Sequence, residues 1–363
     1  MIDRFAPRTR SEERARARAI VDLHALRANV GRLASLAAPA GVMLAVKANA
    51  YGHGLTEVAK AGLAAGATSL AVLEIPAGLT LRAAGVTAPL FAWLHGVDTD
   101  FRAGIEADVE LGISAPWQLD AITDAGASKP ALVHLKLDSG LSRNGATPSE
   151  WPALVSAALA AQAAGAVRIR AAWSHLADAS VEDDEDALRI FLDAVGTAEA
   201  LGARFEVKHL AASSAGIRMP QSRFDFVRFG IAAYGISPFD DRSGADLGLR
   251  PVMSFEADVT QIIEDGRRLA RVAAGYADGV HTAGIGRSNV LLAGTRCQIV
   301  SVAVDSTLVD IGNHSVSPGD VATIFGPGDH GEPTAEEWAM WADTVGDEVV
   351  THVAPRVPRV YLG

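Results

Sequence analysis

A chain of 363 residues with 49% hydrophobic and 21% charged residues has the composition of a soluble globular protein with a large core. Its net charge of -11 argues against a general nucleic-acid-binding surface, and no apolar run of about 20 residues could span a membrane. The single cysteine, Cys297, excludes an intrachain disulfide and a cysteine-based zinc site. We expect Cys297 to be a core residue.

The beginning of the chain predicts no signal peptide. The segment RTRSEERARARA, residues 8–19, is rich in arginine and is not followed by an apolar signal core. We therefore expect a cytoplasmic protein.

From residue 42 to about 236, short β-rich segments alternate with segments of helical length that are rich in alanine and leucine. We predict strands at 42–47, 69–73, 90–94, 108–113, 131–137, 169–174, 205–210 and 231–236. We predict helices between them at 55–66, 74–84, 116–126, 150–165 and 184–202, and an earlier one at 23–37. Eight such units predict a (β/α)8 barrel, and a doubly wound open sheet is the alternative.

The pattern changes after about residue 240, where strand-like segments are separated by glycine, proline and aspartate. One predicted helix, 334–343, interrupts them. The fold class is therefore α/β: an eight-stranded (β/α)8 barrel at 17–244, followed by a mostly β C-terminal domain at 245–363. We expect residues 1–16 to be a flexible N-terminal segment.

Functional side chains of a parallel barrel gather at the carboxyl ends of its strands. Several polar residues fall at such positions beside apolar runs: Lys47, Lys136, Asp138, His175, Ser213 and Arg228. Any one of them could simply be a satisfied polar residue at a strand end. Together they predict a cationic mouth, which is costly to bury unless it binds an anion.

Lys47 is a candidate functional residue, because the chain has only five lysines against 27 arginines. A buried amine can lose its proton and form an imine with a carbonyl, which a guanidinium cannot do. Arg228 and Arg143, if they converge on it, would lower its pKa further. Pyridoxal phosphate would use such an amine, although a mere cap of the strand remains the alternative. Candidate phosphate-binding groups are Tyr51, Ser213 and the GI pair at 230–231.

The segment AAGYADG, residues 273–279, places Tyr276 in a turn flanked by glycines. Most turn tyrosines only pack with their neighbours. Near cations, a phenol can instead act as a proton donor or base, because positive charge lowers its pKa.

Six segments occur in a characteristic order: AVKANAYGHG, LKLDSGLSRNG, WSHLADA, FDFVRFGIAAYGISP, GYADG and PRVPRVY. In these segments, and over nearly its whole length, the chain resembles the alanine racemase family of fold-type III pyridoxal phosphate enzymes. The resemblance implies an N-terminal eight-stranded α/β barrel, a C-terminal β domain and a head-to-tail homodimer with shared active sites.

The resemblance also implies roles for individual residues. Lys47 would hold the cofactor covalently and act as one catalytic base, and Tyr276 of the partner subunit would act as the second base from the opposite face. Two such bases suit racemisation, which removes an α-proton from one face and returns one to the other. Arg228 would face the pyridine nitrogen and keep it unprotonated, with His175 beside the ring and linking Arg228 to the tyrosine.

The remaining matches concern the phosphate and the substrate. The phosphate-binding positions of the family correspond to Tyr51, Ser213, Gly230 and Ile231. Arg143 matches an arginine near the phenolic oxygen of the cofactor and the substrate carboxylate. Lys136 matches a lysine that is carbamylated in many members and positions that arginine.

The chain departs from the family pattern at four positions. Ala212 replaces an asparagine before the phosphate-binding serine, Phe229 replaces a proline, and Val304 replaces a methionine whose backbone amide approaches the substrate carboxylate. Asp347 replaces a tyrosine near the phosphate. A carboxylate about 5 Å from a phosphate charge costs on the order of 3 kcal/mol at an effective dielectric near 20. We therefore expect Asp347 to turn away, to be protonated, or to mark a changed site.

The resemblance implies interconversion of L- and D-alanine for cell-wall precursors. Racemisation of another small amino acid such as serine is the alternative that Val304 suggests. A non-catalytic pyridoxal phosphate-binding protein is a further alternative, although Tyr276 and the second domain argue against it. We predict no metal site, because the histidines lack ligand spacing and the pair His53 and Glu57 has no evident third ligand.

Overall fold

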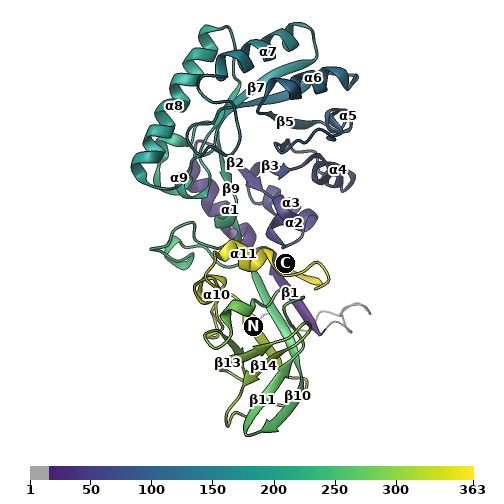
Figure 1. Cartoon of the computed structure of the whole chain (residues 1–363), viewed down its shortest axis with the longest axis vertical. Helices are drawn as coiled ribbons and strands as arrows, with labels where there is room; N and C mark the ends of the chain where they lie inside the picture. The colour runs from purple at the N-terminus through teal and green to yellow at the C-terminus, as the bar shows by residue number, and fades with distance from the viewer. Residues whose placement is uncertain (1–15) are drawn as a thin grey trace. The chain divides into compact units, whose positions relative to one another are not determined.

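The computed structural model describes residues 16–363, which form two compact units. The barrel unit comprises residues 27–50 and 55–233. The β unit combines the chain up to Leu26 with residues 51–54 and 234–363. The predicted flexible segment, 1–16, lies outside the described residues except for Arg16 (Figure 1).

The barrel unit is built on eight parallel strands. In chain order these are β2 (Gly41–Ala45), β3 (Ala67–Leu73), β4 (Leu90–Ala92), β5 (Val109–Ile113), β6 (Ala131–Lys136), β7 (Val167–Trp173), β8 (Val207–His209) and β9 (Phe226–Phe229). Their order in the sheet is β8-β7-β6-β5-β4-β3-β2-β9. Backbone bonds from Asp225 N to Lys208 O (3.1 Å) and from Arg228 N to Ala211 O (3.0 Å) join the two ends of this sheet. The sheet therefore closes into the predicted barrel.

Helices follow most of these strands and lie outside them (Figure 1). They are α3 (Leu55–Ala64), α4 (Ile75–Ala83), α5 (Phe101–Glu106), α6 (Pro116–Asp124), α7 (Trp151–Ala163), α8 (Val181–Ala200) and α9 (Ser213–Arg218), preceded by α1 (Leu23–Ala37) and the short α2 (Lys47–Tyr51). Their starts have local causes. Proline occupies the first turn of α4, α6 and α7, and the Ser180 hydroxyl accepts a bond from Asp183 N to cap α8.

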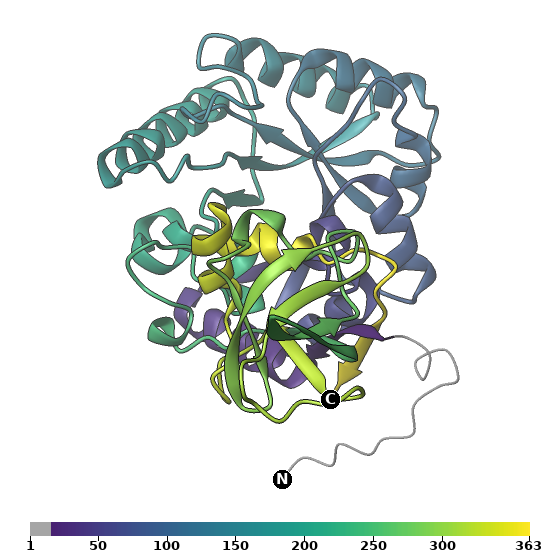
Figure 2. The same ribbon diagram turned by 60° about the horizontal axis from the view of Figure 1, so that its bottom comes forward.

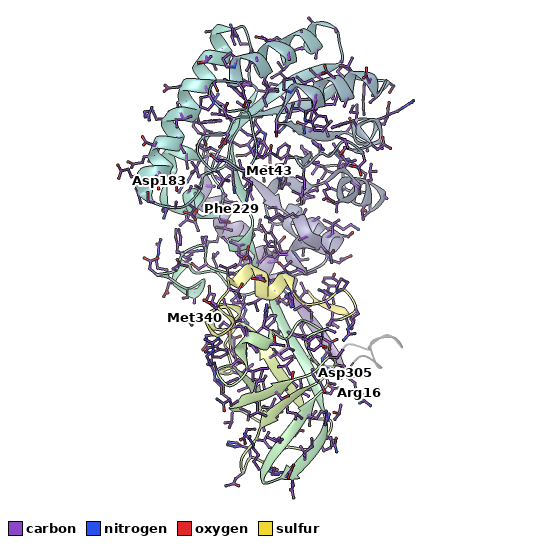
Figure 3. All side chains as sticks on the ribbon, in the orientation of Figure 1. Arg16, Met43, Asp183, Phe229, Asp305 and Met340 are labelled. Carbon is purple, nitrogen blue, oxygen red and sulfur yellow. The ribbon has the colours of Figure 1, made fainter. Side chains whose placement is uncertain are left out.

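The strands of the barrel are apolar because both of their faces are covered. All five residues of β5 are buried. Met43 of β2 and Phe229 of β9, both labelled in Figure 3, lie on neighbouring parallel strands and are at most 2% exposed. This packing fixes the strand ends from which the polar residues project.

The β unit contains a second, mainly antiparallel sheet. Its strands are β1 (Ala17–Asp22), β10 (Met253–Asp265), β11 (Arg267–Val272), β12 (Asn289–Leu292), β13 (Thr295–Val302), β14 (Thr307–Asp310), β15 (Val321–Phe325) and β16 (Arg359–Leu362). Their order is β11-β14-β13-β12-β15-β10-β1-β16, and β10 also pairs with β11. Helices α10 (Ala335–Ala342) and α11 (Gly346–Thr351) follow β15. Cys297 is buried on β13, as expected.

Two strands differ from the prediction. The eighth barrel strand is 226–229, whereas we predicted 231–236, and Ile231–Tyr234 forms a 3-10 turn. Both segments are apolar, but the bond from Ala233 N to Gly230 O curls the second one. Strand β1, which we did not predict, pairs with β10 and, in parallel, with β16. Figure 2 shows these two chain ends side by side within the β unit. Residues 17–26 and 234–244, predicted within the barrel, therefore belong to the β unit by their contacts.

The predicted fold class, an eight-stranded barrel and a C-terminal strand-rich domain, is confirmed. Within residues 16–363, every helix is too short or too polar to cross a lipid bilayer.

Candidate active site

Lys47 follows the last residues of β2 and starts an unusual turn. The next four residues, 48–51, have φ values of 51°, 55°, 55° and 50°, which form a left-handed turn without a single glycine. Each such residue costs roughly 1–2 kcal/mol relative to a right-handed conformation. Ala50 N donates to Val46 O (2.9 Å), and the Asn49 side chain accepts from Leu55 N (2.8 Å). Strain of this kind is concentrated at functional sites, where the surrounding structure maintains it.

The cations predicted at the barrel mouth converge around His175. Burial lowers the pKa of His175 well below its usual value, and the charges of Arg228, Arg143, Lys136 and Lys47 lower it further. Four positive charges therefore lie within electrostatic range of one imidazole. This arrangement fits an anionic ligand and keeps His175 neutral.

Lys136 is almost fully buried at the end of β6. Its Nζ lies 4.6 Å from the centre of the Trp173 ring. Burial, followed by the charges of Arg228 and Arg143, lowers the pKa of Lys136 to about 8, while Asp138 acts in the opposite direction. At neutral pH a share of this amine is therefore unprotonated.

Arg143 is exposed on the loop that follows β6. The Asp138 carboxylate organises this loop by accepting hydrogen bonds from Gly140 N (3.0 Å) and Ser142 N (2.9 Å). Asp138 thus shapes the segment that carries Arg143.

Arg228, on β9, is buried and held by neutral acceptors. Its Nη1 donates to His209 Nδ1 (2.9 Å), and its Nη2 contacts Ser174 O and Leu210 O (both 2.8 Å) and His175 Nδ1 (3.1 Å). Burial lowers the pKa of Arg228 to about 9, which leaves the guanidinium charged at neutral pH. The side chain is therefore fixed in position and still carries its charge.

Ser213, Gly230 and Ile231, the residues predicted to bind a phosphate, come from the start of α9 and the turn that follows β9. Ser213 begins α9, and Gly230 N donates to its hydroxyl (3.2 Å), with Ile231 starting the next turn. Of the two substituted neighbours, Phe229 is a fully buried core residue. Its ring packs against Gly216, where an added Cβ would lie 3.1 Å from it. Ala212 precedes α9 and gives it no side-chain cap.

In the β unit, Tyr51 is buried beside Tyr234, with 4.9 Å between ring centres. Burial raises the pKa of Tyr51 well above its usual value, and the charge of Asp347 raises it further. Asp347 is half-buried in the first turn of α11. Burial, and next the charge of Asp347, therefore favour the protonated Tyr51 hydroxyl, which can donate a hydrogen bond.

Tyr276 and Val304 lie on two segments that are bonded together. Tyr276 N donates to Ala303 O (2.9 Å), and Ala277 N donates to Val304 O (3.0 Å). The side chains of Tyr276 and Val304 remain about half exposed, at 48% and 52%. Asp278 accepts from Gly275 N (2.9 Å) and pairs with Arg356 (2.9 Å), which fixes the turn. The predicted second base and the substituted Val304 therefore belong to one surface of the β unit.

Gly275 permits this close approach of the two segments. A Cβ at Gly275 would collide with backbone atoms of Ala303, Val304 and Asp305. We expect Gly275→Ala to lower the unfolding free energy by roughly 1–3 kcal/mol, the usual cost of overpacking, and to lower activity because Tyr276 moves. Thermal denaturation and steady-state kinetics would measure both effects. The matched control is Gly196→Ala in α8, where a Cβ has open space; equal effects in the two variants would contradict the prediction.

The structure distributes the predicted site residues over both units. The barrel unit holds Lys47, Lys136, Arg143, His175, Ser213, Arg228, Gly230 and Ile231, and the β unit holds Tyr51, Tyr276, Val304 and Asp347. We did not predict His209, which accepts a hydrogen bond from Arg228, although its position at the end of β8 resembles that of the predicted site residues. Among residues 16–363, no group of three or more His, Cys, Asp or Glu side chains could hold a metal ion.

Two protein-family models together match most of the chain. The model of the alanine racemase N-terminal domain matches residues 21–238, and that of the alanine racemase C-terminal domain matches residues 254–361. The chain belongs to the alanine racemase family. The resemblance inferred from the six segments is thereby confirmed.

Individual relatives support the same assignment. The alanine racemase of Beutenbergia cavernae is 43% identical, covering 96% of this chain and 98% of that protein. The alanine racemase of Thermobifida fusca is 41% identical, with the same coverage. Among solved structures, alanine racemase from D-cycloserine-producing Streptomyces lavendulae matches with a TM-score of 0.94 at 40% identity, covering 96% of this chain and 97% of that one.

Proposed function

We propose that this chain interconverts L- and D-alanine with pyridoxal 5'-phosphate as its cofactor. One observation carries the proposal: Lys47, Lys136, Arg143 and Arg228 converge on the neutral His175 at the strand ends of an alanine racemase-family barrel. A small amino acid and a phosphorylated cofactor are both anionic and both suit this environment. The proposed product, D-alanine, would serve as a cell-wall precursor.

The residues present fit the proposed cofactor. Lys47 offers an amine at a turn whose strained backbone is held by its surroundings. Ser213 offers a hydroxyl for a phosphate, and Gly230 N–H holds the oxygen of that hydroxyl in place. Tyr51, kept protonated by burial and by Asp347, offers a further donor. When bound, the cofactor supplies an aldehyde that reacts with amines and an electron-withdrawing ring that makes the α-proton acidic.

Arg228 would face the pyridine nitrogen in this proposal. Because its guanidinium donates to four neutral acceptors and retains its proton at neutral pH, it can offer a hydrogen bond without protonating the ring. His175 would lie beside the ring, held by Arg228 through its Nδ1.

Lys47 and Tyr276 would be the two catalytic bases, one for each face of the substrate. We propose that Tyr276 comes from the partner chain of a head-to-tail homodimer with two shared sites. The half-exposed side chains of Tyr276 and Val304 leave this surface available to a second copy of the chain.

Arg143 would bind the substrate carboxylate, and Val304 would line the substrate pocket. Carbamylation of Lys136 remains a prediction. It is supported by the lowered pKa, because only an unprotonated amine adds carbon dioxide. A carbamate there would carry negative charge and could orient Arg143.

Exchange of the α-proton for deuterium, followed for a panel of amino acids, tests the proposal. We expect exchange with inversion for alanine, observed by NMR and chiral chromatography. Inversion of serine at a higher kcat/KM than alanine would instead support the alternative substrate that Val304 suggests. Absence of exchange with every amino acid, in protein that binds the cofactor, would support a non-catalytic binding protein and refute the proposal.

A further inference from the structure

A chain of buried hydrogen bonds crosses the interior of the barrel from Arg228 to Glu110. Arg228 Nη1 contacts His209 Nδ1 (2.9 Å), His209 Nε2 contacts His134 Nδ1 (2.9 Å), and His134 Nε2 contacts Glu110 Oε2 (2.7 Å). The four side chains come from β9, β8, β6 and β5, and each is less than 9% exposed. We call these four residues the relay.

The donors of the relay follow from its two ends, because Arg228 can only donate and an ionised Glu110 can only accept. A guanidinium can only donate, so His209 Nδ1 must be unprotonated and the proton of this imidazole must be on Nε2. His209 Nε2–H then donates to His134 Nδ1, which places the proton of His134 on Nε2 as well. His134 Nε2–H finally donates to Glu110, which accepts. Any other assignment directs two N–H groups at each other at one of the contacts.

The surroundings of the two histidines favour their neutral forms. Phe91 stacks on His134 with 4.5 Å between ring centres, and Trp173 stacks on His209 at 5.5 Å. Burial lowers the pKa of both histidines, and the charge of Arg228 lowers both further; Glu110 acts to raise the pKa of His134, but the net shift is downward. Neither imidazole is therefore expected to take a second proton at neutral pH.

Glu110 closes the relay with a negative charge. Its Oε2 lies 3.1 Å from Arg170 Nε in an ion pair. Burial acts to raise the pKa of Glu110, but the hydrogen bond and the electrostatic effect of His134, followed by the charges of Arg170 and Arg82, give a net lowering of the pKa. Glu110 is therefore ionised and can only accept.

The relay also explains how the fold tolerates the buried cation Arg228. In the part of the chain that the structure describes, the hydrogen bonds of Arg228 all end on neutral acceptors, and no ion pair joins it to a carboxylate. A buried charge without a counter-charge is costly. Glu110 supplies negative charge at a distance, and the two polarised imidazoles transmit it, since hydrogen bonds in series strengthen one another.

We propose that Glu110 is a positioning residue that acts through His134 and His209 to hold Arg228 in place. Together with Arg228 at the other end of the relay, it favours the Nε2–H tautomer of both imidazoles, so that His209 presents a free lone pair to Arg228. Without the carboxylate, His134 could reverse its proton, and His209 would then direct an N–H at the guanidinium. The consequence for catalysis rests on the proposed function, in which Arg228 meets the cofactor, whereas the relay itself involves only protein groups.

Long-range proton–nitrogen NMR of the full chain with labelled histidine reads the tautomers directly. His134→Gln and His209→Gln variants assign the signals. We expect both histidines to be neutral with the proton on Nε2 in the unchanged protein, with or without cofactor. Glu110→Gln should alter both signals and lower kcat by about 10- to 100-fold, by analogy with the outer hydrogen-bond partners of metal ligands, while the cofactor stays bound.

Glu206→Gln is the matched control. Glu206 also pairs with Arg170 (3.4 Å) but is exposed and makes no contact with the relay histidines. We expect it to leave the histidine signals unchanged and kcat within twofold. Glu110→Asp, which keeps the carboxylate, should restore the tautomers in part and provides a second test if Glu110→Gln does not fold.

Three results would overturn the proposal. The first is a proton on Nδ1 of His134 or His209 in the unchanged protein. The second is a fall in kcat for Glu110→Gln with unaltered tautomers, which would indicate a purely structural role. The third is equal kinetics for the Glu110 and Glu206 variants. Because the NMR readout needs neither substrate nor cofactor, failure of the proposed function would leave it interpretable.

Discussion

Replacing Lys47 by arginine should lower kcat/KM for alanine by at least about 10⁴-fold, a loss typical of removing a covalent catalytic group. Arginine keeps the positive charge near His175, so attraction of an anion to the site persists. What disappears is an amine that can lose its proton, react with a carbonyl and move a proton. The substitution therefore separates the chemistry of the residue from its charge.

The cofactor provides a second readout of this variant. In the unchanged protein, borohydride reduction should shift the long-wavelength absorbance and leave reduced cofactor on the peptide that contains Lys47, as mapped by mass spectrometry. In Lys47→Arg, no peptide should carry it. The matched control is Lys60→Arg on the exposed face of α3, which should behave like the unchanged protein. Reduced cofactor on another lysine would show that Lys47 is not the anchor.

The barrel could be predicted because its strands are buried on both faces and therefore stand out as short apolar segments between helices. That rule could not decide between two adjacent apolar segments, so the eighth strand was placed at 231–236 instead of 226–229. Strand β1 was missed for a different reason. Its sequence, ARAIVD, contains two charged residues, and its partners β10 and β16 lie more than 200 residues away. Pairing over such a distance leaves no local signal.

In the site too, residues marked by a local sequence pattern could be predicted, and contacts between distant strands could not. Lys47, Lys136, His175, Ser213 and Arg228 were predicted because strand ends in a barrel share one face. The relay was not predicted, because polar residues within strands, such as those in VELGI and ALVHLK, look like ordinary alternation. Only the closed barrel turns these side chains toward a common interior.

The effect of Asp347 on the pKa of Tyr51 likewise could not be predicted without knowing the fold. From the sequence it was a carboxylate expected to repel a phosphate, with three outcomes left open. In the structure its charge raises the pKa of Tyr51, a residue almost 300 positions earlier in the chain. It thus favours the protonated phenol, the form that donates a hydrogen bond to an anion.

Tyr276→Phe should lower racemisation by roughly 10²- to 10⁴-fold, the range for losing a general acid or base. The two directions must fall together, because the equilibrium constant between two enantiomers is one. Exchange of the α-proton with deuterium oxide should nevertheless persist, without inversion, for the one enantiomer whose proton Lys47 removes. Tyr361→Phe, which removes the hydroxyl of a partly exposed tyrosine in the same unit, is the control and should leave both rates nearly unchanged. Exchange lost equally for both enantiomers would contradict a two-base role.

Mixing the two inactive variants tests whether Tyr276 acts in the partner chain. If the site is shared across a symmetric dimer, a mixed dimer of Lys47→Arg and Tyr276→Phe has one site with both defects and one intact site. With random pairing about half of the dimers are mixed, so about a quarter of the original activity should return. If Tyr276 instead served its own chain, every site would carry one defect and no activity would return. Co-expression with two different affinity tags, followed by assay of the doubly purified dimer, isolates the mixed species. Because either parent alone is inactive, recovered activity can arise only from a site built by two chains.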